Sequence, residues 1–585
     1  MKPQRLSWYR SKIKYGVRVK YSVLADVYGN LEKNPSHLKK TEILADLLKK
    51  IPEKDLEMVV LLITGNVFPS WSDEELGVAR QLVIKSVSKA YGINEEDIVK
   101  TFNKTGDLGL TVEEYSKKKK QTTLARRELT IDKVFENLRR IAKEAGKGSQ
   151  ERKMNLVAEL ISKAKPKEAR YIIRTVLWQL RVGVARGIVR DSIARAFDVS
   201  PKVVERAWFL NQDFGYLAKI AKEKGEEGLK KIKMSIGKPS SVQLAEKSPS
   251  LQDALDSYDK VALEFKYDGM RAQIHKDKDN YMLWIYTRRL ENVTKAFPDL
   301  VEMCKKYIKC DKCIVEGEIL AIDPKTGKPL PFQRLSQRIK RKYDIEETIK
   351  EIPVKINFFD IFYFKGESLF DKSLEERRNI LEKIIKVVPG KVELAEQLIT
   401  KDFKKADRFY KKALKEGQEG LVVKNLEANY QPGRRVVGGW LKVKPILETL
   451  DLAIIGAIWG TGKRTGWLGS YILGCKDSKT GKFLECGMMG TGIKEKKTEK
   501  EDITFNYLTK MLKPLITKET GNKVDIKPKV VVEVAYEEIQ KSPTYSSGFA
   551  LRFPRLVRVR FDKGPEQADD TKRIEKIFKA QKGRK

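Results

Sequence analysis

The feature that most constrains the fold is a change in hydrophobic periodicity near residue 237. Before it, apolar residues recur at intervals of three and four, the spacing of amphipathic helices, as in 154–164 and 169–197. After it, short runs rich in β-branched and aromatic residues alternate with turns. Because 585 residues are too many for one hydrophobic core, this change predicts separate domains of different class.

Residues 1–236 are therefore expected to be all-α. Ser72 and Glu75 have the spacing of a capping box, which predicts a helix that opens there and ends near Gly92. The lysine run 117–120 is expected in an exposed loop between helices. A solvated turn and a phosphate contact are equally good interpretations of that run.

Residues 237–447 predict an α+β domain with antiparallel sheets. Its expected strands are 261–265, 282–286, 313–322 and 356–364, and its expected helices are 374–387 and 402–416. Residues 448–585 predict an all-β domain with about five strands and a final helix from about Asp570. The clearest of these strands are 452–459, 470–475, 483–488 and 529–537. A region of that size fits a small barrel of the oligonucleotide-binding (OB) type.

The charge balance points to a polyanionic partner. Lys and Arg total 118 against 80 Asp and Glu, a formal net charge of +38. A thermophile-type surface would explain a charged fraction of 34% but not this imbalance. Contacts to the phosphates of a nucleic acid explain it better. No run of eighteen apolar residues and no secretory signal is present, so a soluble cytoplasmic protein without membrane contact is expected.

The cysteines and histidines exclude several classes of site. Cys310 and Cys313 have zinc-knuckle spacing, with Cys304 upstream, but no second pair or nearby histidine completes a set of four ligands. Buried thiols are expected instead. Only His37 and His275 are present, which excludes chemistry built on several histidines.

One segment suggests covalent chemistry. In Glu264-Phe-Lys266-Tyr-Asp-Gly269-Met-Arg271, a lysine follows an apolar strand and precedes a tight Asp-Gly turn. At its usual pKa of ~10.4 only about 0.1% of a lysine is neutral at physiological pH. Partial burial and neighbouring cations would lower that pKa and make the amine a nucleophile. Taken alone, the segment could equally be a β-turn with surface charges.

Further segments place a charged or aromatic residue at a strand end, where a pocket can gather them. They are Thr287-Arg288-Arg289-Leu-Glu291-Asn-Val-Thr294, Glu316-Gly317-Glu318, Phe358-Phe359-Asp360-Ile361, Glu419-Gly-Leu-Val-Val-Lys424 and Trp440-Leu-Lys442-Val-Lys444.

In order and spacing, these segments resemble motifs I, Ia, III, IIIa, IV and V of the ATP-dependent DNA ligases, members of the covalent nucleotidyltransferase superfamily. Residues 545–560 are similar to motif VI of that family. Residues 106–109, 178–183 and 238–245 resemble the helical DNA-binding domain and linker of archaeal and eukaryotic replicative ligases, and the archaeal branch is nearest. The resemblance covers nearly the whole chain. It implies a helical DNA-binding domain at 1–236, an adenylation domain at 237–447 and an OB-fold domain at 448–585.

The resemblance implies an enzyme that seals nicks in duplex DNA during replication, repair and recombination, with ATP as cosubstrate. Lys266 would take AMP from ATP and pass it to the 5′-phosphate of the nick. The 3′-hydroxyl would then attack that phosphate and release AMP.

Other roles are carried over residue by residue. Arg271 and Arg288 would hold the ribose and phosphates, and Arg288 would also meet the nick phosphate. Glu264 would lie near the adenine edge, Phe359 would stack on the adenine ring, and Glu318 would bind the ribose hydroxyl.

The phosphate end of the site follows in the same way. Glu318 and Glu419 would bind a divalent metal, Mg²⁺, because carboxylates suit a hard cation. Lys442 and Lys444 would contact the α-phosphate. Arg435 would be a further nucleotide contact, and Arg552 and Arg555 would orient the pyrophosphate in the first step.

Alternatives remain open at three positions. Phe359 could be ordinary core, Glu316 could replace Glu318 as the functional acid, and Lys424 could bind phosphate or simply lie on the surface. Residues 121–125 lack the aromatic pair by which the family binds the sliding clamp, so any clamp binding there is expected to be weak. A monomer is expected.

Three other classes of protein compete with this interpretation. An RNA-capping guanylyltransferase or RNA ligase would lack the helical domain, and an NAD⁺-dependent ligase would carry a four-cysteine zinc finger. A non-enzymatic DNA-binding protein would not keep every charged motif position.

Overall fold

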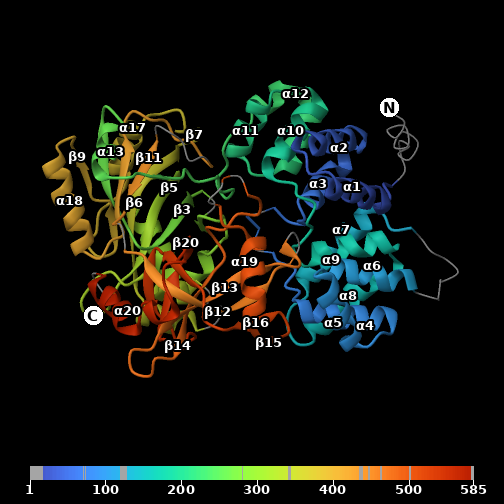
Figure 1. Ribbon diagram of the computed structural model, residues 1–585. Coiled ribbons are helices and arrows are strands. Elements are labelled where there is room, and N and C mark those ends of the chain that lie inside the picture. Colours follow the sequence, from blue (N-terminus) through green and yellow to red (C-terminus); the bar gives the residue numbers. More distant parts are fainter. Residues whose placement is uncertain are drawn as a thin grey trace. The chain divides into compact units, whose positions relative to one another are not determined.

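The computed structural model describes residues 18–69, 71–72, 74–118, 128–279, 281–339, 344–433, 439–445, 448–461, 464–497, 499 and 502–581. The chain divides into two compact units: Met1–Ile98 with Thr111–Lys444, and Val99–Leu110 with Pro445–Lys585. Figure 1 shows helices along the N-terminal part, mixed helices and strands in the middle, and mostly strands toward the C-terminus. The three fold classes predicted from the sequence are therefore confirmed.

The N-terminal region is built from helices alone among its described residues. They are α1 (Tyr21–Lys33), α2 (His37–Lys50), α3 (Glu53–Ile63), α4 (Arg80–Tyr91), α5 (Glu95–Thr105), α6 (Leu108–Lys118), α7 (Ile131–Lys143), α8 (Ser149–Lys163), α9 (Pro166–Val176), α10 (Arg186–Phe197), α11 (Pro201–Leu210) and α12 (Phe214–Lys230). In α7, Val134, Leu138 and Ile141 are buried at helical spacing, which is the pattern that predicted the region.

Three local predictions in this region were wrong in part. The capping box at Ser72 opens no helix, because Gly77 has a φ of +59° and α4 begins only at Arg80, although it does end at Gly92. The predicted run 169–197 is broken between α9 and α10, where Trp178 and Arg181 adopt φ values of +57° and +58°. The lysine run begins inside α6 rather than in a loop, and its second half lies outside the described residues.

The first sheet of the middle domain has the strand order β1-β11-β10-β2-β9. Its strands are β1 (Glu246–Lys247), β2 (Val261–Lys266), β9 (Gln397–Ile399), β10 (Gly420–Asn425) and β11 (Trp440–Val443). Helices α13 (Leu251–Asp256) and α18 (Phe403–Lys415) pack on its apolar face, where Leu263 and Phe265 lie. Because side chains alternate along a strand, Glu264 and Lys266 lie on the opposite face.

The second sheet has the order β4-β3-β5-β6-β7, with β8 paired to β6. Its strands are β3 (Met270–Asp277), β4 (Met282–Thr287), β5 (Lys312–Ala321), β6 (Val354–Phe364), β7 (Glu367–Ser368) and β8 (Val392–Leu394). The helices beside it are α14 (Pro298–Tyr307), α15 (Phe332–Ile339), α16 (Ile345–Glu351) and α17 (Leu374–Ile384). Leu300, Cys304 and Leu335 of these helices join Ile274 and Val315 of the sheet in one core.

The C-terminal unit is dominated by one sheet of seven strands and a two-stranded hairpin. Its strands are β12 (Leu450–Trp459), β13 (Leu468–Lys476), β14 (Phe483–Met489), β15 (Ile516–Thr520), β16 (Lys523–Ile526), β17 (Val531–Ala535), β18 (Glu538–Lys541), β19 (Phe549–Arg552) and β20 (Arg555–Val559), with helices α19 (Phe505–Leu512) and α20 (Thr571–Ala580). Strand β12 pairs with β16 at one end and β17 at the other, as a strongly curled sheet requires. The described residues hold nine strands here, so the prediction of about five was too low.

All five cysteines are unbridged, and only Cys310 is more than marginally exposed, which confirms the expectation of buried thiols. Within the described ranges, no helix is long and apolar enough to cross a membrane.

Candidate active site

Lys266 is the last residue of β2 and is followed by the bend at Asp268 and Gly269. A Cβ atom at Gly269 would collide with the carbonyl oxygen of Ile319 and would lie 3.0 Å from Cγ of Glu318. Only glycine allows the turn to approach β5 so closely. The predicted Asp-Gly turn is therefore confirmed, and it brings the lysine to the polar face of the second sheet.

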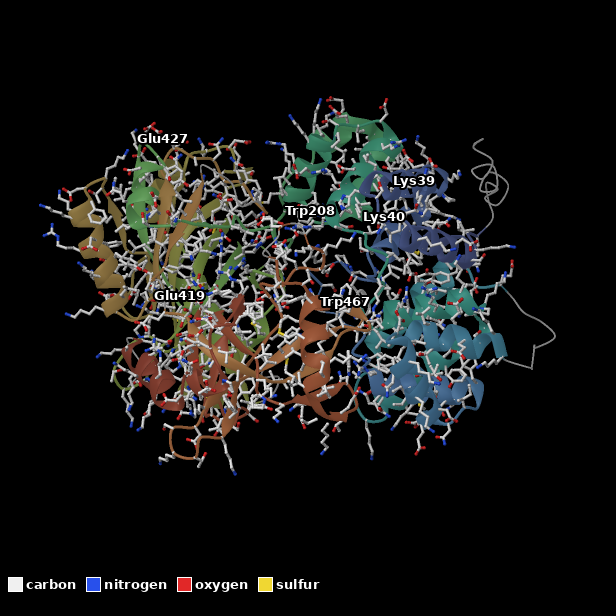
Figure 2. The ribbon with its side chains drawn as sticks, viewed as in Figure 1. Lys39, Lys40, Trp208, Glu419, Glu427 and Trp467 are labelled. Carbon is white, nitrogen blue, oxygen red and sulfur yellow. The ribbon has the colours of Figure 1, made fainter. Side chains whose placement is uncertain are left out.

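A single carboxylate, that of Glu419, joins two lysines at this point. Its Oε2 lies 2.8 Å from Nζ of Lys266 and 2.6 Å from Nζ of Lys444. The backbone N–H of Glu419 also donates to the carbonyl oxygen of Lys266 at 2.8 Å, which fixes the two residues side by side. Glu419 is labelled in Figure 2.

Charge at this cluster is balanced differently from the expectation. Burial raises the pKa of Glu419, but the ammonium groups of Lys266 and Lys444 outweigh it and lower that pKa to about 2. Lys266 therefore has a carboxylate as well as a cation beside it. The sequence predicted the cations only.

Glu318 faces the same cluster from β5. Burial raises the pKa of its carboxyl group to about 8, although the charges of Lys266 and Arg271 oppose this, and the charge of Glu419 adds to it. The mutual effect of Glu318 and Glu419 shows two carboxylates close enough to repel each other. A cation between them would relieve that repulsion.

Arg271 is held by a network of buried groups. Its guanidinium binds Glu316 through two contacts, from Nε at 3.1 Å and Nη2 at 2.7 Å, and Nη1 donates to the carbonyl oxygen of Gln243 at 2.6 Å. The hydroxyl of Tyr430 donates to Glu316 at 2.9 Å. Although burial alone would lower it, Glu316 raises the pKa of Arg271 above its usual value.

A second buried ion pair joins Glu264 to Lys424. Their Oε2 and Nζ atoms are 2.5 Å apart, and the two side chains are 3% and 2% exposed. Nζ of Lys424 also lies 4.6 Å from the ring centroid of Phe359 and 4.4 Å from that of Trp440. The two sheets therefore meet through their polar faces, since Phe359 comes from β6 and the other residues from the first sheet.

These contacts decide two of the open alternatives on geometry. Glu316 is fully buried and committed to Arg271, whereas Glu318 faces Lys266. Lys424 is 2% exposed, so its interpretation as a surface residue was wrong. Phe359 is 8% exposed and packs edge-on against Trp440 at 6.0 Å, which suits both a core residue and one wall of a nucleotide site.

The remaining predicted residues lie at different distances from this cluster. Lys442 is half-buried on β11, on the same strand face as Lys444. Arg288 is exposed just beyond the end of β4. Arg435 lies outside the described residues. In the C-terminal unit, Arg552 pairs with Glu538 at 3.0 Å, and Arg555 is exposed at the start of β20.

Three residues in these networks had not been predicted. Tyr430 and Gln243 hold Arg271, and Gln397 donates to Oε1 of Glu264 at 2.9 Å. Each lies in an irregular or very short segment, where periodicity carries no signal. A buried tyrosine just before the Pro-Gly turn at 432–433 was the only hint available.

The donor set around Lys266 bears on metal binding. Among the residues that the structure describes, no group of three or more His, Cys, Asp or Glu side chains is placed to hold a metal ion. Glu318 and Glu419 alone supply two carboxylates, which fits a hard divalent cation that takes its other ligands from phosphate and water.

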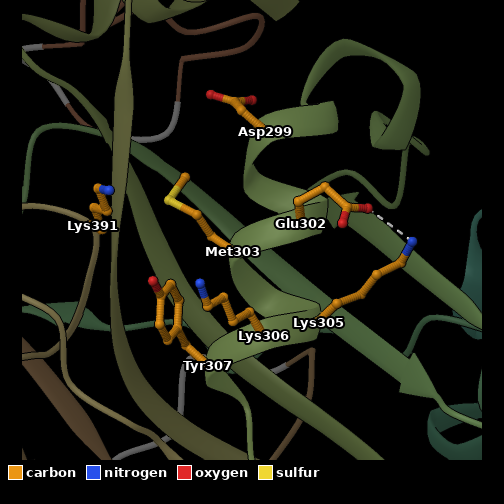
Figure 3. Close-up of a pocket in the computed structure, with 7 residues that line it drawn as sticks. All are labelled: Asp299, Glu302, Met303, Lys305, Lys306, Tyr307 and Lys391. Atoms are coloured by element: carbon orange, nitrogen blue, oxygen red, sulfur yellow. Dashed lines mark hydrogen bonds and ion pairs between the residues drawn. The ribbon is translucent and has the colours of Figure 1, made fainter.

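Figure 3 shows a separate pocket of about 470 Å³ on α14. It is lined by Asp299, Glu302, Met303, Lys305, Lys306, Tyr307 and Lys391. Because α14 packs on the apolar face of the second sheet, this pocket lies across the sheet from Arg271 and Glu318. It is therefore not part of the cluster around Lys266.

Three family models match the chain. They are the DNA ligase N terminus at residues 20–194, the ATP dependent DNA ligase domain at 242–444 and the ATP dependent DNA ligase C terminal region at 464–563. Lys266, Glu318, Glu419 and Lys444 all lie inside the second match.

Similar proteins extend the match to almost the full length. The DNA ligase of Nanoarchaeum equitans is 48% identical over 97% of this chain and 99% of its own. The DNA ligase of Archaeoglobus fulgidus is 44% identical over 96% of this chain and 99% of its own. Among solved structures, Pmar-Lig_Pre is similar in fold, with a TM-score of 0.57 at 15% identity over 92% of this chain and 99% of that one.

Proposed function

The chain belongs to the family of ATP-dependent DNA ligases, and from this premise we propose that Lys266 is the nucleophile that accepts AMP. Nζ of Lys266 attacks the α-phosphorus of ATP and forms a phosphorus–nitrogen bond. The bond from that phosphorus to the oxygen bridging the α- and β-phosphates breaks, and pyrophosphate leaves with its electron pair. The arrangement of Lys266, Glu419 and Lys444 where two polar sheet faces meet is the observation that supports this proposal.

The two later steps use the same site. An oxygen of the 5′-phosphate at the nick attacks the phosphorus of the lysine adduct, and the amine of Lys266 leaves. The 3′-hydroxyl then attacks the activated 5′-phosphate and releases AMP, which forms the new phosphodiester bond. Lys442 and Lys444 hold the α-phosphate through these exchanges of charge.

The nucleotide is positioned by groups that are already fixed. Arg271 is held by Glu316, Tyr430 and Gln243 and therefore meets the ribose and phosphates without reorganising. Phe359 stacks on the adenine, and Glu264 reads its edge. Arg288, which is exposed, holds the phosphate of the nick.

Glu318 and Glu419 would hold a magnesium ion. When bound, that ion would neutralise the charge that develops on the phosphates during transfer. Glu318 also contacts the ribose hydroxyl, since it lies directly across from Arg271 in the pairing of β3 with β5.

The remaining arginines serve the first step. Arg552 and Arg555 orient the leaving pyrophosphate, and Arg435 adds a further nucleotide contact. Glu538 keeps the Arg552 side chain ordered until a phosphate replaces it, because their ion pair at 3.0 Å is only part-buried.

We assign the domains as 1–236 for DNA binding, 237–447 for adenylation and 448–585 for the OB fold. The substrate is nicked duplex DNA, bound by a monomer. Sliding-clamp binding through residues 121–125 remains a weak proposal, and that segment lies outside the described residues.

The direct test is to incubate the protein with ATP and magnesium and map the adduct by mass spectrometry. AMP should be found on Lys266, and Lys266→Arg should form no adduct and seal no nick. Lys260→Arg, at an exposed lysine of the same domain, is the matched control and should behave as wild type. An adduct at another residue, or GMP labelling alone, would overturn the proposal.

A further inference from the structure

The Glu264 carboxylate is held at both of its oxygens. Gln397 lies directly across from it on β9 and donates from Nε2 to Oε1 at 2.9 Å. Lys424 comes from β10 on the other side, and its Nζ lies 2.5 Å from Oε2. The carboxylate is therefore clamped between the two neighbouring strands of its own sheet.

We propose that Lys424 and Gln397 are positioning residues that make the chain select adenine over guanine, because together they hold Glu264 as a fixed hydrogen-bond acceptor. This inference rests on the proposed function, in which Glu264 reads the edge of the base. It adds two residues that act through Glu264 and need not touch the nucleotide.

The chemistry of the two bases supports this assignment. At the position where adenine carries an exocyclic amine, a donor, guanine carries a carbonyl oxygen, an acceptor. An ionised carboxylate accepts hydrogen bonds and donates none, and each oxygen retains an acceptor position after binding one partner. A fixed Glu264 can therefore accept from adenine but must repel the carbonyl of guanine.

Lys424 is the group that could defeat this selection. Its ammonium has three donors and no acceptor, so a free Lys424 would bind the carbonyl of guanine. Instead it is 2% exposed, paired with Glu264 and placed against the faces of Phe359 and Trp440. The aromatic rings and the carboxylate together keep this donor away from the base.

Gln397 fixes the other oxygen and its own amide. Because its NH₂ group is used by Glu264, the orientation of the amide is set. Without it, Oε1 of Glu264 would lose its partner on the half-buried side of the pair, and the carboxylate could rotate. Without Lys424, the buried carboxylate would lack a compensating cation, and its neutral form carries a donor that guanine can use.

The experiment measures the second-order rate constant for adduct formation on Lys266 with ATP and with GTP. Lys424→Met and Gln397→Met should each reduce the preference for ATP by about tenfold or more, the scale expected for losing one fixed polar contact. Lys424→Arg keeps a cation beside Glu264 and should retain most of the preference. Matched controls are Lys355→Met, at a half-buried ion-paired lysine of β6, and Gln252→Met on the exposed side of α13.

The outcomes separate this inference from the one beneath it. If wild-type protein forms no adduct with either nucleotide, the proposed function fails. If the variants form adducts more slowly but keep the wild-type ratio of ATP to GTP, their role is only structural and the inference is overturned. Should Lys424→Met fail to fold, Gln397→Met decides, since it removes no buried charge.

Discussion

The hydroxyl of Tyr430 uses every hydrogen bond that such a group can make. It donates to Glu316 at 2.9 Å and accepts from Arg271 at 3.3 Å and from the backbone N–H of Gln243 at 3.0 Å. Its ring is stacked on Phe370, with centroids 5.1 Å apart. Burial, and after it the charge of Glu316, raises the pKa of Tyr430 well above its usual value, so the hydroxyl keeps its proton.

Removing that hydroxyl should therefore be costly even though the ring still fits. Tyr430→Phe would leave a carboxylate oxygen and a buried N–H without a partner, and we expect a loss of about 1–3 kcal/mol in unfolding free energy. The KM for ATP in adduct formation should rise, because Arg271 loses one support. Urea titration and adenylation kinetics measure the two effects. Tyr410→Phe, at a half-buried ring, should leave both unchanged.

His275 is a buried base whose neutral form the fold requires. Its Nδ1 accepts from the backbone N–H of Gly237 at 3.1 Å, and Nε2 faces Oε1 of Gln273 at 3.4 Å. Burial lowers the pKa of His275 to about 3, whereas an exposed histidine has a pKa of about 6.5. Between these two pH values the unfolded chain binds a proton that the folded chain does not.

Stability should therefore fall as the pH drops below about 6.5, and this loss should continue until about pH 3. At pH 5 the contribution of His275 is on the order of 2 kcal/mol. Urea midpoints at pH 7.5 and pH 5 should thus differ more for wild type than for His275→Gln. The exposed His37 provides the control, and an equal slope in His275→Gln would contradict the prediction.

At the same scale, the sequence predicted which residues gather but not how they pair. Lys266, Glu318, Glu419 and Lys444 each stand at or near a strand end or on one strand face, so their convergence follows from the motifs and from alternation. Burial depth does not. Glu316 and Glu318 lie on the same face of β5, and only the packed structure shows that the first is fully buried.

Among the elements, β10 depends on its first residue. Gly420 has a φ of +138°, and a Cβ atom there would collide with the carbonyl oxygen of Val443 and lie 3.3 Å from Cα of Lys444. This close approach is what brings Lys444 to Glu419. A side chain at Gly420 would separate the two strands that carry the cluster.

We expect Gly420→Ala to cost about 3 kcal/mol or more, since backbone strain and overpacking act together. Adduct formation should also fall sharply, because Glu419 and Lys444 move apart. Thermal unfolding and adenylation assays check both. Gly417→Ala is the matched control in the same loop: it also has positive φ, at +79°, but nothing lies within 4 Å of its Cβ. It should lose only about 1 kcal/mol and adenylate normally.

Element types were predicted better than element ends. Strands β2, β4, β5 and β6 and helices α17 and α18 all lie within a few residues of their predicted bounds. The failures share a cause. Gly77, Trp178 and Arg181 adopt positive φ values that interrupt helices, and for the latter two no local sequence rule predicts that conformation, because tertiary packing imposes it.

At the scale of the whole molecule, the excess of positive charge exceeds what internal pairing can use. With 118 basic and 80 acidic residues, many lysines and arginines must lack an acidic partner whatever the fold. Those residues raise the potential over broad areas rather than in one recognition helix. Such a distribution suits a backbone-directed interaction with duplex DNA that is independent of sequence.

Affinity for nicked duplex DNA should accordingly depend steeply on salt. Neutralising several phosphates releases their condensed counterions, so the Kd should rise by about 100-fold or more between 50 and 200 mM monovalent salt. Two nicked duplexes of unrelated sequence should give the same curve in fluorescence anisotropy. The Lys266→Arg variant keeps its charge and should bind with the same salt slope as wild type while forming no adduct. A flat salt response, or a strong preference for one sequence, would mean that contacts to bases rather than to phosphates bring this ligase to its nick.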